Sequence, residues 1–204
     1  MSKSFSEHER DLIRQNLIEA CKECWNRYGY HKTGIRELAV MANISSGAFY
    51  QFFDSKEMLF LATANEYQKE LTRLFHEKMQ NHPGKQGVAE GVKAMASIMA
   101  DMPWITSMWE DWPVIARKLP PGYIEQDFRG DMVRIEEIIR LYKLTPKRSA
   151  ETVTQIIDIL LTSVSRPNFM PGETKESVDF IIDAVINDLF ESPGVPSPQN
   201  AAEA

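Results

Sequence analysis

Helical periodicity is the feature that most constrains the fold of this chain. Along most of its 204 residues apolar side chains recur three or four positions apart, and no segment alternates convincingly as a β-strand. We expect the first helix to end at Gly29, a residue suited to a left-handed C-terminal cap. The apolar residues of that helix lie close to one face: Ile13, Leu17, Cys21, Cys24 and Tyr28.

Capping residues, prolines and glycines divide the rest of the pattern into further helices, about nine in all. Thr33 is a candidate N-cap for a short helix over 33–42, and Ser45 caps a second short helix over 46–53. A longer helix is expected over 56–80, and Pro113 should kink or split one of those that follow. The later helices are predicted over 87–101, 105–119, 123–142, 146–164 and 174–191, with breaks that include residues 167–172.

Charge is distributed unevenly along the chain. The net charge of −6 argues at first against a nucleic-acid partner. However, the first sixty residues hold eight Lys or Arg and eight Asp or Glu, so the whole excess of acid lies further along. The N-terminal portion is therefore the plausible place for a surface that faces phosphate.

Several functional classes find no support in the sequence. The longest apolar runs fall short of the roughly 18 residues that cross a bilayer, and the polar N-terminus lacks the apolar stretch of a secretory signal, so we expect a cytoplasmic protein. No phosphate loop, nucleophile elbow or metal-ligand spacing occurs, and the four histidines lie in polar segments. We therefore predict no enzyme activity, cofactor or metal. Cys21 and Cys24 form a CxxC that favours burial on a helix over a redox or metal role.

The two short helices fit a helix-turn-helix, whose second helix lies in the DNA major groove. Phe49 and Phe53 can turn inward, while the start of the second helix offers free N–H groups to a phosphate. The other positions of that helix carry hydroxyl, amide and bare backbone groups: Ser45, Ser46, Gly47, Tyr50 and Gln51.

The residues over roughly 8–60 resemble the signature of the TetR family of regulators. The resemblance rests on W25-x-x-x-G29-Y30-x-x-T33-x-I35-R36-E37-L38-A39-x-x-A42-x-I44-S45-x-G47-x-F49-Y50-x-F52-F53-x-S55-K56-E57-x-L59. It implies a three-helix DNA-binding domain, here residues 1–54, and an all-helical ligand-binding and dimerisation domain, here 55–191. Residues 192–204, rich in Pro, Ser and Ala, are predicted to be disordered.

The resemblance also implies which residues contact DNA. The candidates are Thr33, Gly34, Ser45, Ser46, Gly47, Tyr50, Gln51 and Lys56. Three positions depart from the family pattern, since Gly34, Asn43 and Ser46 stand where a Thr or Ser, a Gly and a Lys are common. Asn tolerates a left-handed backbone, so we expect the turn to survive.

A cluster of Met and aromatic residues between 95 and 132 is denser than close packing requires, and flexible Met suits surfaces that repack around varied apolar ligands. In TetR-like proteins the ligand cavity lies among the corresponding helices, so we expect a mostly apolar effector, aromatic or cationic and amphipathic. A hydrophobic core is the alternative for each residue. The candidate lining residues are Met95, Met99, Trp104, Met108, Trp109, Trp112, Phe128 and Met132.

The last two predicted helices carry apolar stripes wider than one packing partner needs, which favours the four-helix homodimer interface that the resemblance implies. The candidate interface residues are Ile156, Leu160, Ile182, Val185 and Leu189, with burial in the core of a single chain as the alternative. The function expected is a repressor released from a palindromic DNA operator by a small effector. The alternative is a helical adaptor for protein partners that does not bind specific DNA sequences.

Overall fold

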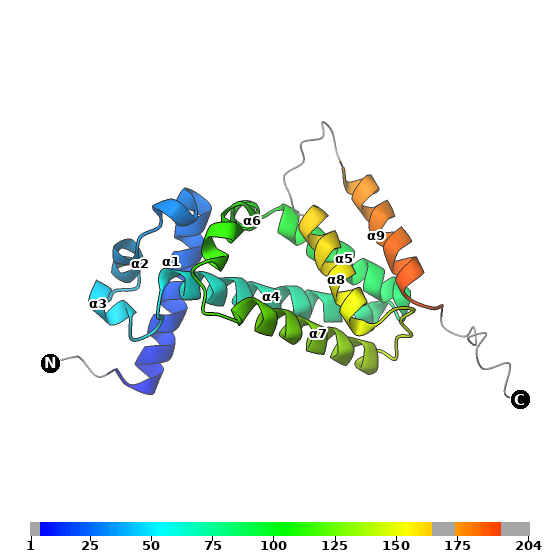
Figure 1. Ribbon diagram of the computed structural model, residues 1–204, viewed down its shortest axis with the longest axis horizontal. Coiled ribbons are helices and arrows are strands. Elements are labelled where there is room, and N and C mark those ends of the chain that lie inside the picture. The colour runs from blue at the N-terminus through cyan, green and yellow to red at the C-terminus, as the bar shows by residue number, and fades with distance from the viewer. Residues whose placement is uncertain (1–4, 165–173, 193–204) are drawn as a thin grey trace, which may run out of the picture. The chain divides into compact units, whose positions relative to one another are not determined.

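The computed structural model describes residues 5–164 and 174–192, without the side chains of 103–109 and 164. Over that range the chain forms nine α-helices and no strand, so the all-helical class is confirmed (Figure 1). None of the helices there is long and apolar enough to cross a membrane. The helices are α1 (Glu7–Lys32), α2 (Ile35–Met41), α3 (Ser46–Phe49), α4 (Lys56–Asn81), α5 (Lys85–Ala100), α6 (Pro103–Ala116), α7 (Tyr123–Leu141), α8 (Ala150–Val164) and α9 (Lys175–Leu189).

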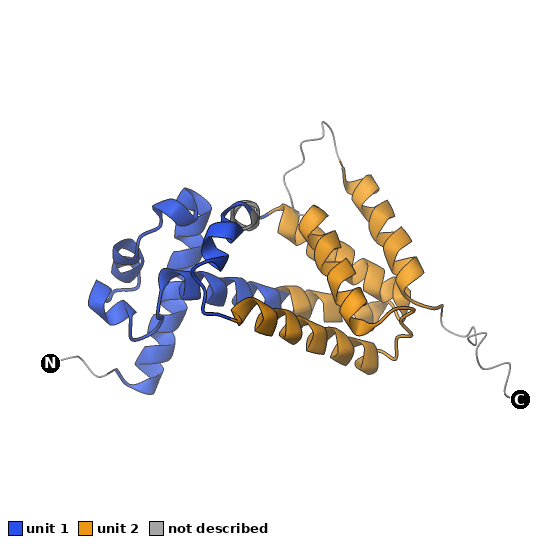
Figure 2. Ribbon diagram, in the orientation of Figure 1, with its two compact units in different colours: residues 1–70, 102–121 blue, residues 71–101, 122–204 orange. Residues whose placement is uncertain are grey.

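The chain divides into two compact units (Figure 2). The N-terminal unit comprises residues 1–70 and 102–121, and the C-terminal unit comprises 71–101 and 122–204. The N-terminal unit thus extends beyond the predicted boundary at residue 54, because α6 packs with α1 and the first part of α4 contacts α1 through Lys56 and Phe60. The predicted disordered tail lies outside the described residues from 193 onward, as do the predicted break at 167–172 and its flanks.

Aromatic side chains from α1, α3 and α4 form the core of the N-terminal unit. Trp25, Tyr30, Phe49 and Phe60 are all buried, and the Trp25 and Phe60 ring centroids lie 4.1 Å apart. Burial of side chains of this size stabilises a fold by roughly 1.5–3 kcal/mol each. The core therefore fixes the start of α4 against α1, while α3 packs against α2.

The first helix runs one turn further than predicted. Gly29 has the positive φ expected of it, +73°, but the chain resumes helical geometry and α1 ends at Lys32. The reason is that side chains bind the carbonyl groups around the kink, since Thr33 Oγ1 donates to Gly29 O at 2.8 Å and Lys56 Nζ to Tyr30 O at 2.8 Å. Orphan carbonyls at the end of a helix need such partners.

Tertiary contacts also shift other predicted boundaries. The helix over 46–53 is a helix only to Phe49 and continues as hydrogen-bonded turns, in which Gln51 N donates to Ala48 O at 3.0 Å. Pro113 does not split α6. Helix α8 begins at Ala150 rather than at residue 146, because the preceding loop pairs with the end of α9 through Lys147 N to Leu189 O at 2.8 Å.

Two glycines of α5 allow close packing in the C-terminal unit. A Cβ at Gly91 would lie 2.4 Å from the Phe75 ring of α4. A Cβ at Gly87 would lie 1.9 Å from the carbonyl oxygen of His82, which is backbone and cannot rotate away. The turn between α4 and α5 therefore requires glycine at position 87.

We predict that Gly87→Ala lowers the free energy of unfolding by about 2–3 kcal/mol, because the added methyl group must displace backbone. The matched control is Gly130→Ala in α7, where the nearest atom to an added Cβ is the flexible Arg134 side chain at 3.6 Å. That control should gain up to about 1 kcal/mol from helix propensity. Urea unfolding measures both, and equal effects at the two positions would refute the packing argument.

Candidate nucleic-acid interface

Helices α2 and α3 form the predicted helix-turn-helix. Asn43 lies in the turn with φ +57°, so the prediction that it adopts a left-handed backbone there is confirmed. Ser45 Oγ accepts a hydrogen bond from Ala48 N at 3.1 Å, which confirms the predicted cap of α3. The sequence therefore sets both the turn and the start of the second helix.

The segment 46–53 turns its two sides to different surroundings. Phe49 and Phe53 are buried, as predicted, and Arg14 of α1 lies 4.6 Å above the Phe53 ring. Arg10 Nη2 donates to Gln51 O at 3.0 Å and so fixes the C-terminal end of the segment. The polar side of the segment is exposed at Ser45, Ser46, Gly47, Tyr50 and Gln51.

A hollow of about 460 Å³ lies beside this segment. It opens at the start of α2 and the start of α4, two places where helices present backbone N–H groups. Four of the eight predicted DNA-binding residues thus lie around one concave surface. The hollow is lined by Thr33, Gly34, Ile35, Tyr50, Asp54, Ser55, Lys56 and Glu57.

Two of the predicted DNA-binding side chains are engaged inside the protein. Thr33 is buried and binds the carbonyl of Gly29, so the prediction that it caps α2 is wrong and the N-cap is Gly34. Lys56 Nζ donates to Tyr30 O at 2.8 Å and to Thr33 O at 3.0 Å. It also lies 3.9 Å from the centroid of the Tyr30 ring. Burial lowers the pKa of this lysine, the negative charge of Glu57 opposes the shift, and the positive charge of Lys118 adds to it.

Glu57 is a buried carboxylate at this site that the sequence analysis did not single out. Its Oε1 accepts a short hydrogen bond from the hydroxyl of Tyr30 and a second from Lys118 Nζ at 3.2 Å. Burial would raise the pKa of Glu57, but hydrogen bonds from Tyr30, from backbone, from Lys118 and from Ser55 outweigh it and lower the pKa to about 2. Glu57 is therefore ionised at neutral pH, with its charge balanced by Lys118.

The sequence contained only part of the signal for this site. Tyr30, Lys56 and Glu57 all belong to the quoted motif. Lys118 follows α6 and lies far along the chain, so no local pattern pairs it with Glu57. Only the packing of α6 on α1 brings the two charges together.

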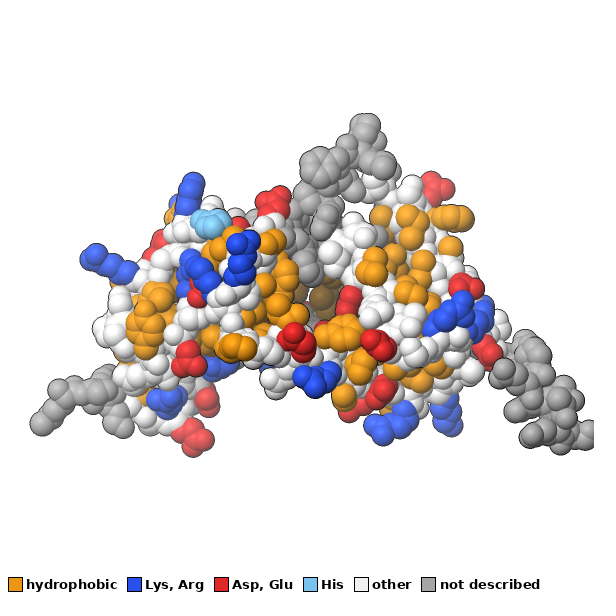
Figure 3. Space-filling view, viewed as in Figure 1, with side chains coloured by type: hydrophobic (Ala, Val, Ile, Leu, Met, Phe, Trp, Pro, Cys, Tyr) orange, Lys and Arg blue, Asp and Glu red, His pale blue; other side chains and the backbone are white. Residues whose placement is uncertain are grey.

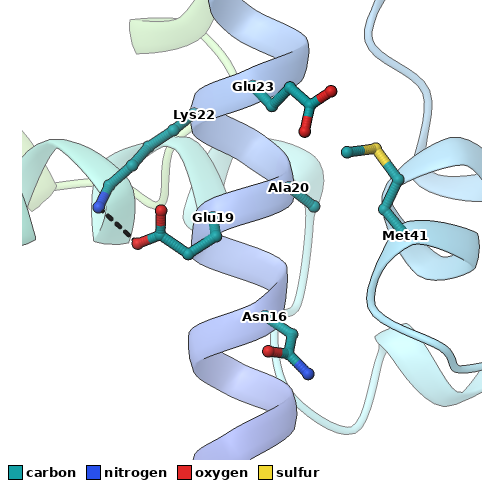
Figure 4. A pocket seen from close by; sticks show the side chains of 6 residues that line it. All are labelled: Asn16, Glu19, Ala20, Lys22, Glu23 and Met41. Carbon is teal, nitrogen blue, oxygen red and sulfur yellow. Dashed lines mark hydrogen bonds and ion pairs between the residues drawn. The ribbon is translucent and has the colours of Figure 1, made fainter.

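A second, open hollow of about 350 Å³ lies between α1 and the end of α2 (Figure 4). Its α1 side carries Glu19, which is paired with Lys22 at 2.7 Å, and Met41 stands on the α2 side. Met41 also contacts Cys24, since the two sulfur atoms, Cys24 Sγ and Met41 Sδ, lie 3.4 Å apart. Both cysteines are free and buried, as predicted, and burial raises the pKa of Cys21 to about 12.

The predicted effector-binding residues are divided between the two units. Met95, Phe128 and Met132 are half-buried and Met99 is buried, all in the C-terminal unit. Trp112 is half-buried in the N-terminal unit. The side chains of Trp104, Met108 and Trp109 lie outside the described residues.

Carboxylates gather where α7 and α8 pack together in the C-terminal unit. Asp127 and Asp158 are both exposed, but partial loss of hydration beside the neighbouring helix, and then the charge of Asp131, raise the pKa of Asp127 and raise the pKa of Asp158 to about 6. Arg134, which pairs with Asp131, acts in the opposite direction on both. The region therefore has an excess of negative charge.

The predicted dimer residues lie at different depths. Leu160, Ile182 and Leu189 are buried within the subunit, and Ile156 and Val185 are half-buried. Other apolar side chains of α8 and α9 are exposed, and Figure 3 shows hydrophobic side chains gathered over these helices. The exposed ones are Ile159 at 65%, Phe180 at 72% and Ile181 at 47%.

Comparison with known proteins identifies the helix-turn-helix region. Residues 17–63 match the family profile described as bacterial regulatory proteins, tetR family, a range that holds α2, α3 and the hollow beside them. Residues 17–63 are a TetR-family domain. The resemblance noted from the sequence motif is thereby confirmed.

Known transcriptional regulators are similar to this chain over most of its length. The HTH-type transcriptional repressor AcnR of Corynebacterium efficiens is 22% identical over 76% of this chain and 94% of its own length. The structure of Thermus thermophilus FadR in complex with lauroyl-CoA covers 90% of this chain and 98% of its own, with 17% identity and a TM-score of 0.64. The structure of RolR in complex with resorcinol covers 89% of this chain and 88% of its own, with 19% identity and a TM-score of 0.60. At these identities the two structures support the TetR fold.

The depressed pKa of Glu57 predicts a specific loss of stability in acid. Ionised Glu57 stabilises the fold fully above its ordinary pKa of 4.5, and the contribution falls as the pH drops toward the folded value of about 2. The difference between the two values corresponds to roughly 3 kcal/mol. We expect Glu57→Gln to be less stable than wild type at pH 7, with a gap that narrows between pH 4.5 and pH 3. Urea unfolding across that range measures the gap, and a gap independent of pH would contradict the prediction.

Proposed function

We propose that this protein is a DNA-binding transcriptional repressor that acts as a homodimer and is released from its operator by a small, mostly apolar effector. The observation that carries the proposal is the exposed polar side of residues 45–51, beside the hollow at the start of α2 and α4. The protein would act in the cytoplasm, as a regulator and not as an enzyme.

The proposed DNA contacts fall into two kinds. Residues of the exposed segment, above all Tyr50 and Gln51, would reach base edges in the major groove. The hollow at the start of α2 and α4 would take a phosphate on backbone N–H groups. Thr33 and Lys56 would act indirectly, by fixing the backbone of the hollow, because their side chains bind carbonyls of the protein itself.

The effector would bind in the region of the Met and aromatic cluster. Half-buried Met95, Phe128 and Met132 supply adaptable apolar surface in the C-terminal unit. The excess of carboxylates between α7 and α8 favours an apolar ligand that carries a positive charge over one that is anionic. The bound molecules in the related structures, lauroyl-CoA and resorcinol, differ so widely that the fold alone does not choose among ligand classes.

The exposed apolar side chains of α8 and α9 support the homodimer. Ile159, Phe180 and Ile181 would pack against the same helices of a second subunit, with the half-buried Ile156 and Val185 beside them. The buried residues Leu160, Ile182 and Leu189 would support these helices from within the subunit. Each dimer would then present two reading segments to DNA.

Selection of bound duplexes from a random pool tests the proposed function. We expect an inverted repeat with half-site centres about 34–36 Å apart, or a multiple of this. Tyr50→Ala should weaken binding to the selected duplex about tenfold, whereas Tyr28→Ala, which changes an exposed tyrosine of α1 outside the hollow, should leave it unchanged. A pool that remains unenriched would favour the adaptor alternative and remove the proposal.

A charged residue in the exposed apolar surface should disrupt the dimer. Phe180→Asp places a carboxylate in the proposed interface, so we expect sedimentation to shift from dimer to monomer at micromolar concentration. Val133→Asp is the matched control, because this α7 residue is also apolar and exposed, at 52%. A wild-type protein that sediments as a monomer, or equal behaviour of the two variants, would show that α8 and α9 are not the interface.

A further inference from the structure

We infer that Lys118 is a positioning residue for DNA binding, which acts by neutralising the Glu57 carboxylate at the edge of the DNA-facing hollow. The inference rests on the proposed function, since it concerns how the hollow accepts a phosphate. It assigns a role in DNA recognition to a residue outside the helix-turn-helix and outside the matched range 17–63.

Three helical regions of the N-terminal unit meet at Glu57. Tyr30 from the last turn of α1 donates its hydroxyl proton to the Glu57 carboxylate. Lys118, in the turn after α6, donates to Tyr30 Oη at 2.8 Å and to Glu57 Oε1 at 3.2 Å. Its ammonium group also lies 5.3 Å from the centroid of the Tyr30 ring. Lys118 thus contacts both partners of the buried hydrogen bond at once.

Glu57 takes part in two surfaces. It binds Lys118 and Tyr30, and it is also one of the residues that line the hollow beside Tyr50. A carboxylate at that place repels a DNA phosphate unless its charge is balanced, and the repulsion is strong in a partly buried site. Asp54, a second acidic residue, lines the same hollow, so the balance provided by Lys118 matters more.

Lys56 forms no hydrogen bond or ion pair with Glu57 in the described residues. Its ammonium group donates instead to the carbonyls of Tyr30 and Thr33. Burial lowers its pKa, the negative charge of Glu57 opposes that shift, and the positive charge of Lys118 adds to it. Lys118, in contrast, has its pKa raised by its hydrogen bonds to Tyr30 and Glu57. Of the two lysines, Lys118 is the one that forms an ion pair with Glu57 in the described structure.

The placement of Lys118 also ties α6 to the hollow. One residue of α6 itself makes a similar link, since Asp111 Oδ1 lies 3.2 Å from His31 Nε2 in the last turn of α1. The end of α1 leads directly into Gly34 and the start of α2. A displacement of the turn after α6 would remove Lys118 from both partners. The Glu57 charge at the hollow would then be unbalanced, and Tyr30 would lose its hydrogen bond from Lys118.

The test is a double-mutant cycle on binding to the selected duplex, measured by fluorescence anisotropy. Lys118→Met should weaken binding about tenfold, because the unbalanced Glu57 charge then faces phosphate. Lys118→Arg keeps the charge and should remain within about threefold of wild type. The double variant Glu57→Gln with Lys118→Met should recover binding to within about threefold of Glu57→Gln alone, because no charge is left to balance.

Lys22→Met serves as the control. Lys22 is also ion-paired within the N-terminal unit, but it does not line the DNA-facing hollow beside Tyr50. The inference would be overturned if Lys118→Met bound the duplex as tightly as Lys22→Met does. It would also be overturned if the double variant bound the duplex as weakly as Lys118→Met, because Lys118 would then serve the fold and not the charge of Glu57. If Lys118→Met does not fold, the comparison of the double variant with Glu57→Gln decides. Failure of the duplex selection itself would instead count against the proposed function.

Discussion

The N-terminal unit depends on how the last turn of α1 is held. Lys56 binds the carbonyls of Tyr30 and Thr33, and Glu57, the next residue of α4, binds the hydroxyl of Tyr30. One helix start therefore fixes the end of another through two side chains of opposite charge. The start of α2 follows immediately, so the geometry of the helix-turn-helix rests on this junction.

The same junction joins parts of the chain that are distant in sequence. Helix α6 belongs by packing to the N-terminal unit, although it lies within the range that the sequence assigned to the effector domain. An effector that favours one arrangement of α6 over another would change DNA affinity by the same coupling energy with which DNA changes effector affinity. The contact of Asp111 with His31 and the ion pair of Lys118 with Glu57 are physical links through which such coupling would pass.

Local chemistry made much of the fold predictable, and long-range packing accounts for the differences. The bounds of α4 and α7, the cap at Ser45 and the left-handed Asn43 follow from helical period and from residue type. Thr33 was assigned as a cap of α2 because the pattern does not reveal that Lys56 and Gly29 draw it into the end of α1. The ion pair of Glu57 with Lys118 also depends on packing between distant segments, so the sequence pattern did not reveal it. For the apolar residues of α8 and α9, the pattern does not distinguish burial within one subunit from burial in a dimer.

Hydrogen exchange with and without the selected duplex tests most directly whether the N-terminal unit grips DNA through the surface described. Amides in a DNA interface become protected, whereas those remote from it change little. The account predicts that added protection appears in residues 29–36 and 45–57, with α7 and the exposed face of α9 unchanged. Protection confined to α7–α9, or an unchanged exchange rate in residues 45–57 of the saturated complex, would contradict the account.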